Sequence, residues 1–230
     1  MDIAALALGT WMLYVLDRML DARRSAMPLQ EERHRFHGEH RILFLGMIAC
    51  AVPVLVLLLT HMEPRLLHAY LLLGLALAGY FALIHIRRFT RRFANAVPKE
   101  LAVGVIFAAA IFMPEFLRGV LRPLSQALCF GALCWLNCTV IYQREHHDLH
   151  DAHWSTRFAI RYAPLLLGAI AAAGLVLFFT GRASHALSLS VVMSAIVLTA
   201  MGSARHRMDR LSFRIAADAA LLTPLLFLFR

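Results

Sequence analysis

Two aspartates near the N-terminus have a spacing that suits metal binding. Asp17 and Asp21 occur in the stretch YVLDRMLDARR, at the end of a very apolar segment. Residues four apart share one face of a helix, so the two carboxylates can hold one divalent cation or its hydration shell. The alternative is that both acids pair with neighbouring arginines at the membrane interface. We favour a site, because acids within membrane segments usually face a bundle interior.

Histidines gather in two stretches, ERHRFHGEH and REHHDLHDAH, and each stretch also contains acids. Imidazole and carboxylate together are ligands for zinc, iron or manganese. The candidate metal ligands in these stretches are His34, His37, His40, His146, His147, Asp148, His150 and Asp151. If the second stretch is helical, His146, His150 and His153 share a face. The alternative is that these histidines hydrogen-bond lipid headgroups or neighbouring acids.

A third stretch, HIRRFTRRFANAVPKE, contains four arginines and the only lysine of the chain. Such a loop sets the orientation in the membrane and meets anionic lipid headgroups. Arginine and lysine also neutralise phosphate, arginine as a bidentate fork and lysine as a point charge. We therefore interpret Arg91, Arg92 and Lys99 as candidate ligands of a diphosphate, in addition to their topological role.

The composition predicts which kind of element positions these residues. The chain has 230 residues, is 60% hydrophobic and has a mean hydropathy of +0.67, well above the usual range of soluble domains. This predicts an integral membrane protein. The net charge of +9 does not indicate nucleic-acid binding, because the basic residues lie between apolar segments instead of forming one water-facing surface. The four cysteines lie within apolar segments and predict no disulfide framework.

Eight segments are long and apolar enough to cross a bilayer as helices, which takes roughly 20 residues each. They are Ile3 to Leu20, Ile42 to Thr60, Leu66 to Ile86, Leu101 to Leu117, Leu124 to Tyr142, Ile160 to Thr180, His185 to Gly202 and Leu211 to Phe229. The sequence therefore predicts an all-α, polytopic membrane helix bundle that forms one transmembrane domain over 1–230. We interpret the first segment as a retained span, because it lacks the pattern of a cleaved signal peptide.

The basic residues predict the orientation of this bundle. Of the 23 lysines and arginines, 18 fall in alternate loops on one side and five on the other. The positive-inside rule then places the long loops in the cytoplasm and both termini outside. We expect the membrane to be a bacterial inner membrane. All the candidate residues above then lie on its cytoplasmic side.

Polar residues and glycines inside the spans predict how the helices pack. Asn137 is expected to make a hydrogen bond in the bundle interior. Asp218 is predicted to be a buried acid, with Arg214 one turn earlier as its partner. Small residues that let helices approach closely are expected at Gly104, Gly131, Gly168 and Gly174.

Three sequence stretches follow one another along the chain in an order that resembles a known family. They are DRMLDA at 17–22, the loop ending in PKELAVGVIFA, and IYQREHHDLHDAHWSTRFA at 141–159. They resemble the two aspartate-rich motifs and the basic connection of the UbiA superfamily of intramembrane prenyltransferases. The second motif includes the ST pair that follows its acids. The resemblance covers nearly the whole chain, and the eight spans would correspond to the family's nine without the first helix.

The resemblance implies a helical bundle around a cavity open to lipid, in which magnesium ions hold an isoprenyl diphosphate beside a lipophilic acceptor. It implies that Asp17, Asp21 and Asp148 bind the metal and act in catalysis. The chain departs from the family pattern at Leu13, where the family has asparagine, and at Arg144, where it has the first acid of the second motif.

These departures leave three hypotheses open. The first is a divergent prenyltransferase that uses a divalent metal, magnesium in that case. The second is a membrane oxidoreductase that binds iron, zinc or manganese through the histidines. The third is a non-catalytic homologue that binds a lipid or quinone. All three imply the lipid bilayer and a lipophilic small molecule as partners.

Overall fold

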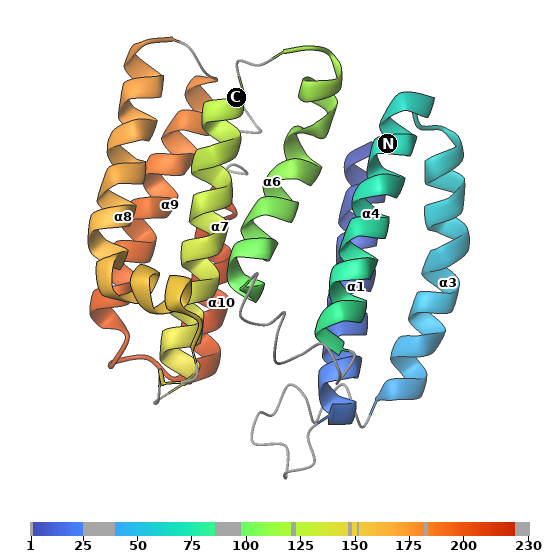
Figure 1. Cartoon of the computed structure of the whole chain (residues 1–230), viewed down its shortest axis with the longest axis horizontal. Helices are drawn as coiled ribbons and strands as arrows, with labels where there is room; N and C mark the ends of the chain where they lie inside the picture. The colour runs from blue at the N-terminus through green and yellow to red at the C-terminus, as the bar shows by residue number, and fades with distance from the viewer. Residues whose placement is uncertain are drawn as a thin grey trace. The chain divides into compact units, whose positions relative to one another are not determined.

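The computed structural model of the protein describes residues 2–24, 40–85, 98–120, 123–146, 149–150, 152–181 and 184–223. These described residues form helices and short connections, without a strand among them. The helices are α1 (Asp2–Arg24), α3 (Arg41–Thr60), α4 (Pro64–His85), α6 (Lys99–Leu117), α7 (Leu124–Glu145), α8 (Trp154–Phe179), α9 (His185–Ala204) and α10 (Arg210–Ala220) (Figure 1). The all-helical fold predicted from the sequence is confirmed.

Six of these helices are long and apolar enough to cross a membrane, namely α3, α4, α6, α7, α8 and α9. In α1 the apolar part, Ile3–Leu16, is shorter than a span. The helix α10 has 11 residues. The described helices therefore indicate an integral membrane protein, while the count of eight spans stays a prediction.

The chain divides into two compact units, Met1–Ala69 and Tyr70–Arg230. In the first unit, α1 packs against α3. The boundary falls within α4, and the second unit contains the rest of α4 together with α6 to α10. The single transmembrane domain expected from the sequence stays a prediction.

The hydrophobic core of the second unit lies between α7, α8, α9 and α10. Leu133 and Leu136 of α7, Leu198 of α9 and Phe213 of α10 are almost completely buried in it. Small side chains at the centre let the helix backbones approach each other. These are Ala159, Ala195 and Ala217.

Glycines bring two pairs of helices into close contact. A Cβ built on Gly104 of α6 would overlap the carbonyl oxygen of Gly131 of α7, and one built on Gly174 of α8 would lie 2.9 Å from a methyl carbon of Val192. The predicted close packing is therefore confirmed at these three glycines. It is not found at Gly168, which lies at an exposed position where an added Cβ meets nothing within 4 Å among the described residues.

Side-chain hydrogen bonds hold the C-terminal end of α10 against α9. The Ser194 hydroxyl donates to the carbonyl oxygen of Ala220 at 2.7 Å, and the Thr223 hydroxyl donates to that of Ser190 at 3.1 Å. Both bonds are buried. Together with the core contacts of Phe213 and Ala217, they fix α10 against α9 and so help to position the polar residues of α10 described below.

Asp209 caps the N-terminus of α10, where its carboxylate accepts a hydrogen bond from the Ser212 backbone N–H at 3.0 Å. Hydrogen bonds from the side chain and then the backbone of Ser212 hold the pKa of Asp209 below its ordinary value of 3.8. A lowered pKa means that the cap stabilises α10 above that value, and that this contribution is lost as the pH falls through the lowered pKa.

We expect Asp209→Ala to lower the melting temperature in detergent at neutral pH, because the cap is removed. Asp209→Asn keeps an acceptor but does not titrate, so the wild type should lose its advantage over this variant in acid. A difference in melting temperature between wild type and the Asn variant that stays constant from neutral to acid pH would contradict the assignment.

Candidate functional site

Most of the predicted site residues lie outside the part that the structure describes. Outside the described residues are His34, His37, Arg91, Arg92, His147, Asp148 and Asp151. Asp17 and Asp21 lie on α1, and at these two positions the structure describes the backbone but not the side chains. The described candidates are His40 before α3, Lys99 at the start of α6, His146 after α7, and His150. The roles of the undescribed residues and side chains stay predictions.

The histidines of the second motif do not form a helical face. The helix α7 ends at Glu145, and the backbone of His146 is extended, with φ −108° and ψ 122°. The next helix, α8, begins only at Trp154. The hypothesis that His146, His150 and His153 share one helical face is therefore wrong, because extended backbone and a turn separate them.

Two of these histidines have local structural roles. The His146 ring stacks on Tyr142 with centroids 4.0 Å apart, and its Nδ1 lies 3.1 Å from the Tyr142 carbonyl oxygen. Nδ1 of His153 accepts a hydrogen bond from the Ser155 backbone N–H at 3.2 Å and so caps α8. Within the described ranges, no three His, Cys, Asp or Glu side chains are grouped so that they could hold a metal ion.

The last two residues of α7, Arg144 and Glu145, make contacts with a main-chain carbonyl and an arginine instead of forming a metal site. Nη2 of Arg144 donates to the Met208 carbonyl oxygen at 2.7 Å. Glu145 accepts a hydrogen bond from Nη1 of Arg214 at 3.0 Å, with the two side chains 14% and 18% exposed. A guanidinium has no lone pair for a metal, and the carboxylate is held by a cation. These two positions therefore link α7 to α10 and to the segment that leads into it.

The ion pair at the end of α7 extends along α10 to Asp218. Nε of Arg214 lies 3.9 Å from Oδ2 of Asp218, and Nδ2 of Asn137 donates to Oδ1 of Asp218 at 3.1 Å. The predicted pair of Arg214 with Asp218 and the interior hydrogen bond of Asn137 are thus confirmed. The prediction of a buried Asp218 is wrong, since its side chain is 58% exposed. It lies on the outer face of α10, whereas its neighbour Ala217 faces the core.

The starts of α6 and α8 meet at the same end of the second unit. Oε2 of Glu100 accepts a hydrogen bond from the Thr156 hydroxyl at 3.2 Å, and Thr156 is almost completely buried. Together with the contacts of α7 to the segment before α10, this bond brings four helix ends together. We call this region, which consists of the starts of α6, α8 and α10 and the end of α7, the polar end.

An apolar groove of about 230 Å³ lies between α4 and α6. Its lining residues are Ala76, Leu77, Tyr80, Leu101, Ala102, Val105 and Ile106. Lys99 is exposed and stands two residues before the first α6 residue that lines the groove. The groove therefore begins near the polar end, and Lys99 stands in the first turn of the helix α6 that forms one of its walls.

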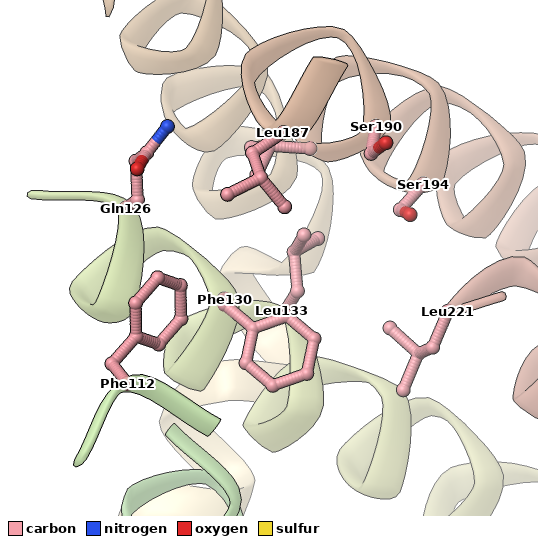
Figure 2. A pocket seen from close by; sticks show the side chains of 9 residues that line it. Phe112, Gln126, Phe130, Leu133, Leu187, Ser190, Ser194 and Leu221 are labelled. Atoms are coloured by element: carbon pink, nitrogen blue, oxygen red, sulfur yellow. The ribbon is translucent and has the colours of Figure 1, made fainter. Parts of the chain in front are cut away.

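A smaller cavity lies near the starts of α7 and α9, at the opposite end of the unit. Phe112, Phe130 and Leu133 surround it on one side, with Ser190 and Ser194 on the α9 wall (Figure 2). Its volume of about 20 Å³ is room for a single water molecule. The two serine hydroxyls donate to main-chain carbonyls, so we interpret them as groups that stabilise the packing of α9.

Glu100 and Thr156 were not predicted from the sequence to belong to the polar end. A signal exists for each, since Glu100 follows the only lysine and Thr156 belongs to the ST pair after the second motif. An acid in the first turn of a helix is usually explained by the helix dipole alone. Their contact across 56 residues is a tertiary feature that no local pattern predicts.

No family model matches the sequence, and neither a curated protein nor a solved structure is found to match it. The likeness to the UbiA superfamily rests on the motifs and their order in the chain, and it stays a hypothesis.

Proposed function

We propose that the chain is a divergent UbiA-like membrane prenyltransferase homologue, which transfers an isoprenyl group from a prenyl diphosphate to a lipophilic acceptor. The observation that carries this proposal is the apolar groove beside the start of α6. Leu101 and Ala102 line the groove, and Lys99 stands in the same turn of the helix. This combination suits an amphiphile with an apolar tail and an anionic phosphate head.

Prenyl transfer needs positive charge at the diphosphate and an apolar surrounding for the prenyl group. The bond between the allylic carbon and the diphosphate oxygen breaks, and its electron pair leaves with the diphosphate. The acceptor then supplies the electron pair of the new bond to carbon and loses its proton to the departing diphosphate. Cations stabilise the departing diphosphate, and apolar walls keep water from the allylic cation. Lys99 supplies one cation in this proposal, and Arg91 and Arg92 are the others expected from the sequence.

A divalent metal would add further positive charge at the diphosphate when bound. The described positions of the second motif do not fit such a metal, because Arg144 is itself cationic and Glu145 pairs with Arg214. The carboxylates that the sequence offers to a metal are Asp17, Asp21, Asp148 and Asp151. Among the described residues, Lys99 therefore holds the diphosphate in this proposal, and the groove between α4 and α6 holds the prenyl tail.

A second candidate function is a non-catalytic homologue that binds the same kind of isoprenoid. It is favoured by Arg144, which replaces an acid of the family motif and is held by a main-chain carbonyl. The oxidoreductase hypothesis receives no comparable support, since His146 and His153 make the local contacts described above. Turnover of a prenyl diphosphate distinguishes the two remaining candidates.

We further propose that the protein lies in a bacterial inner membrane, with its long loops cytoplasmic and both termini outside. The contacts at the polar end support one part of this topology, that the segments assigned to the cytoplasm from their basic residues lie on the same side of the membrane. These contacts are those of Thr156 with Glu100 and of Arg144 with Met208.

If Lys99 holds the diphosphate, its substitution should lower the affinity for a prenyl diphosphate. In calorimetric titrations of purified protein in detergent with farnesyl diphosphate, Lys99→Ala should weaken binding about tenfold, since one charge-assisted contact is lost. Lys99→Arg should retain most of the affinity. Leu101→Trp should weaken binding as well, because the indole fills the groove.

Arg118→Ala is the matched control, since this arginine is exposed at the other end of α6. It should leave binding unchanged. Equal affinities for wild type and Lys99→Ala would refute the diphosphate site, and inorganic diphosphate binding as tightly as the prenyl form would refute the groove.

A further inference from the structure

Tyr80 differs in kind from the other residues that line the groove between α4 and α6. Among the described residues that form this lining, Tyr80 alone is aromatic, and the others are aliphatic. Aliphatic walls keep water away from a reactive group but do not stabilise a charge beside them. The face of an aromatic ring attracts a cation that lies within about 6 Å of its centre. Tyr80 therefore gives this apolar groove a side chain that can stabilise a positive charge.

Tyr80 lies at the end of the groove where the proposed head group binds. It stands five residues before His85, the last residue of α4, and it interacts electrostatically with Glu100 in the first turn of α6. Lys99 belongs to the same turn. Because the diphosphate is placed at Lys99, the first carbon of the prenyl group lies at this end of the groove, and so beside Tyr80.

The charges near Tyr80 favour the separation of charge that prenyl transfer requires. Lys99 is exposed at the start of α6, whereas Glu100 is partly buried and accepts a hydrogen bond from the Thr156 hydroxyl at 3.2 Å. When the carbon–oxygen bond of a prenyl diphosphate breaks, the diphosphate gains negative charge and the allylic carbons gain positive charge. The lysine has the sign that suits the diphosphate, and the ring face and the carboxylate have the sign that suits the allylic carbons.

We propose that Tyr80 is a further catalytic residue, whose ring face stabilises the allylic cation as the bond to the diphosphate breaks. The electron pair of that bond leaves with the diphosphate, and the positive charge stays on the allylic carbons until the acceptor supplies the electron pair of the new bond. The proton of the acceptor goes to the departing diphosphate. The ring forms no bond in this step and acts through electrostatic attraction alone. This inference rests on the proposed function, because it requires a prenyl group in the groove.

The first test measures binding and needs no turnover. Farnesyltrimethylammonium carries a permanent positive charge at the head of a prenyl chain, and its carbon analogue has the same shape without the charge. Both are titrated into the purified full chain in one detergent, with inorganic diphosphate present. The preference for the charged ligand should fall about fivefold in Tyr80→Leu, the size expected for one contact between a cation and a ring. In Tyr80→Phe, which keeps the ring, it should stay as in the wild type.

Two results of this titration overturn the inference. An equal preference in the wild type and in Tyr80→Leu shows that the ring does not attract the cation, and a loss in Tyr80→Phe as large as in Tyr80→Leu assigns the effect to the hydroxyl. Binding of the carbon analogue reports that each variant is folded, and Tyr80→Met replaces the leucine variant if that binding is lost. Tyr162→Leu is the matched control, since this tyrosine of α8 is 38% exposed and does not line the groove.

The second test measures turnover of farnesyl diphosphate. Tyr80→Leu should lower kcat about tenfold and leave KM nearly unchanged, because the ring acts on a charge that develops only in the transition state. Tyr80→Phe and Tyr162→Leu should retain the kcat of the wild type. Turnover by the wild type with an equal kcat in Tyr80→Leu overturns this inference and leaves the proposed function standing. Absence of turnover by the wild type contradicts the proposed function itself, and with it any catalytic role of Tyr80.

Discussion

Arg214→Met is expected to destabilise the protein by about 3 kcal/mol, the cost of breaking a largely buried ion pair by removing one of its members. The variant removes one ion-pair partner of Glu145, whose side chain is 14% exposed, and one contact of Asp218. The methionine fills a similar volume, so the loss reports on charge and not on a cavity. The melting temperature in detergent, compared at one protein concentration, measures the effect.

Two further variants separate the ion pair from a general effect of removing an arginine. Arg214→Met combined with Glu145→Gln should recover much of the lost stability, because both charges of the broken ion pair are then removed. Arg118→Met removes a cation that also pairs with a glutamate, but there the side chains are 70% and 45% exposed. That change should cost at most about 1 kcal/mol, and an equal cost at Arg118 and Arg214 would contradict the buried pair.

Gly104→Ala is the second substitution with a large expected effect, about 2 kcal/mol of destabilisation from overpacking. The added methyl group would overlap the Gly131 carbonyl oxygen, which belongs to the backbone and cannot rotate away. It would also crowd the backbone of Trp135. The helices α6 and α7 must therefore separate, which thermal unfolding and the fluorescence of Trp135 should both report.

Gly168→Ala is the matched control for this change. Gly168 also lies inside a long helix, and an added Cβ meets nothing within 4 Å among the described residues. Alanine favours the helix over glycine by about 1 kcal/mol, so this variant should be as stable as the wild type or more stable. If Gly104→Ala were also neutral, the close approach of α6 and α7 would be refuted.

The positions of the helices could be predicted from the sequence because long apolar runs in a membrane chain have to form helices. The ends of these helices were less predictable. The predicted span over Leu124 to Tyr142 continues to Glu145 in the structure, since Arg144 and Glu145 are satisfied by α10 and the segment before it. The helix α8 begins at Trp154, six residues before the predicted span, because His153 caps it there.

The pairing of charges could be predicted only where it is local. Arg214 and Asp218 are one turn apart, so their pairing followed from helical spacing. The contact of Arg214 with Glu145 joins residues that are 69 positions apart, and other arginines near α10 were equally good partners by sequence alone. The exposure of Asp218 was mispredicted for a related reason, since an apolar run does not say which face of the helix meets the core.

The central proposal, prenyl transfer, is tested most directly by measuring release of diphosphate from farnesyl diphosphate by the purified protein, with magnesium or manganese and a lipophilic phenol present. We expect release that depends on the protein, that is lost in Asp17→Asn, and that is reduced in Lys99→Ala but not in Arg118→Ala. Binding of farnesyl diphosphate without release would favour the non-catalytic homologue. Neither binding nor release above a protein-free control would contradict the proposed function.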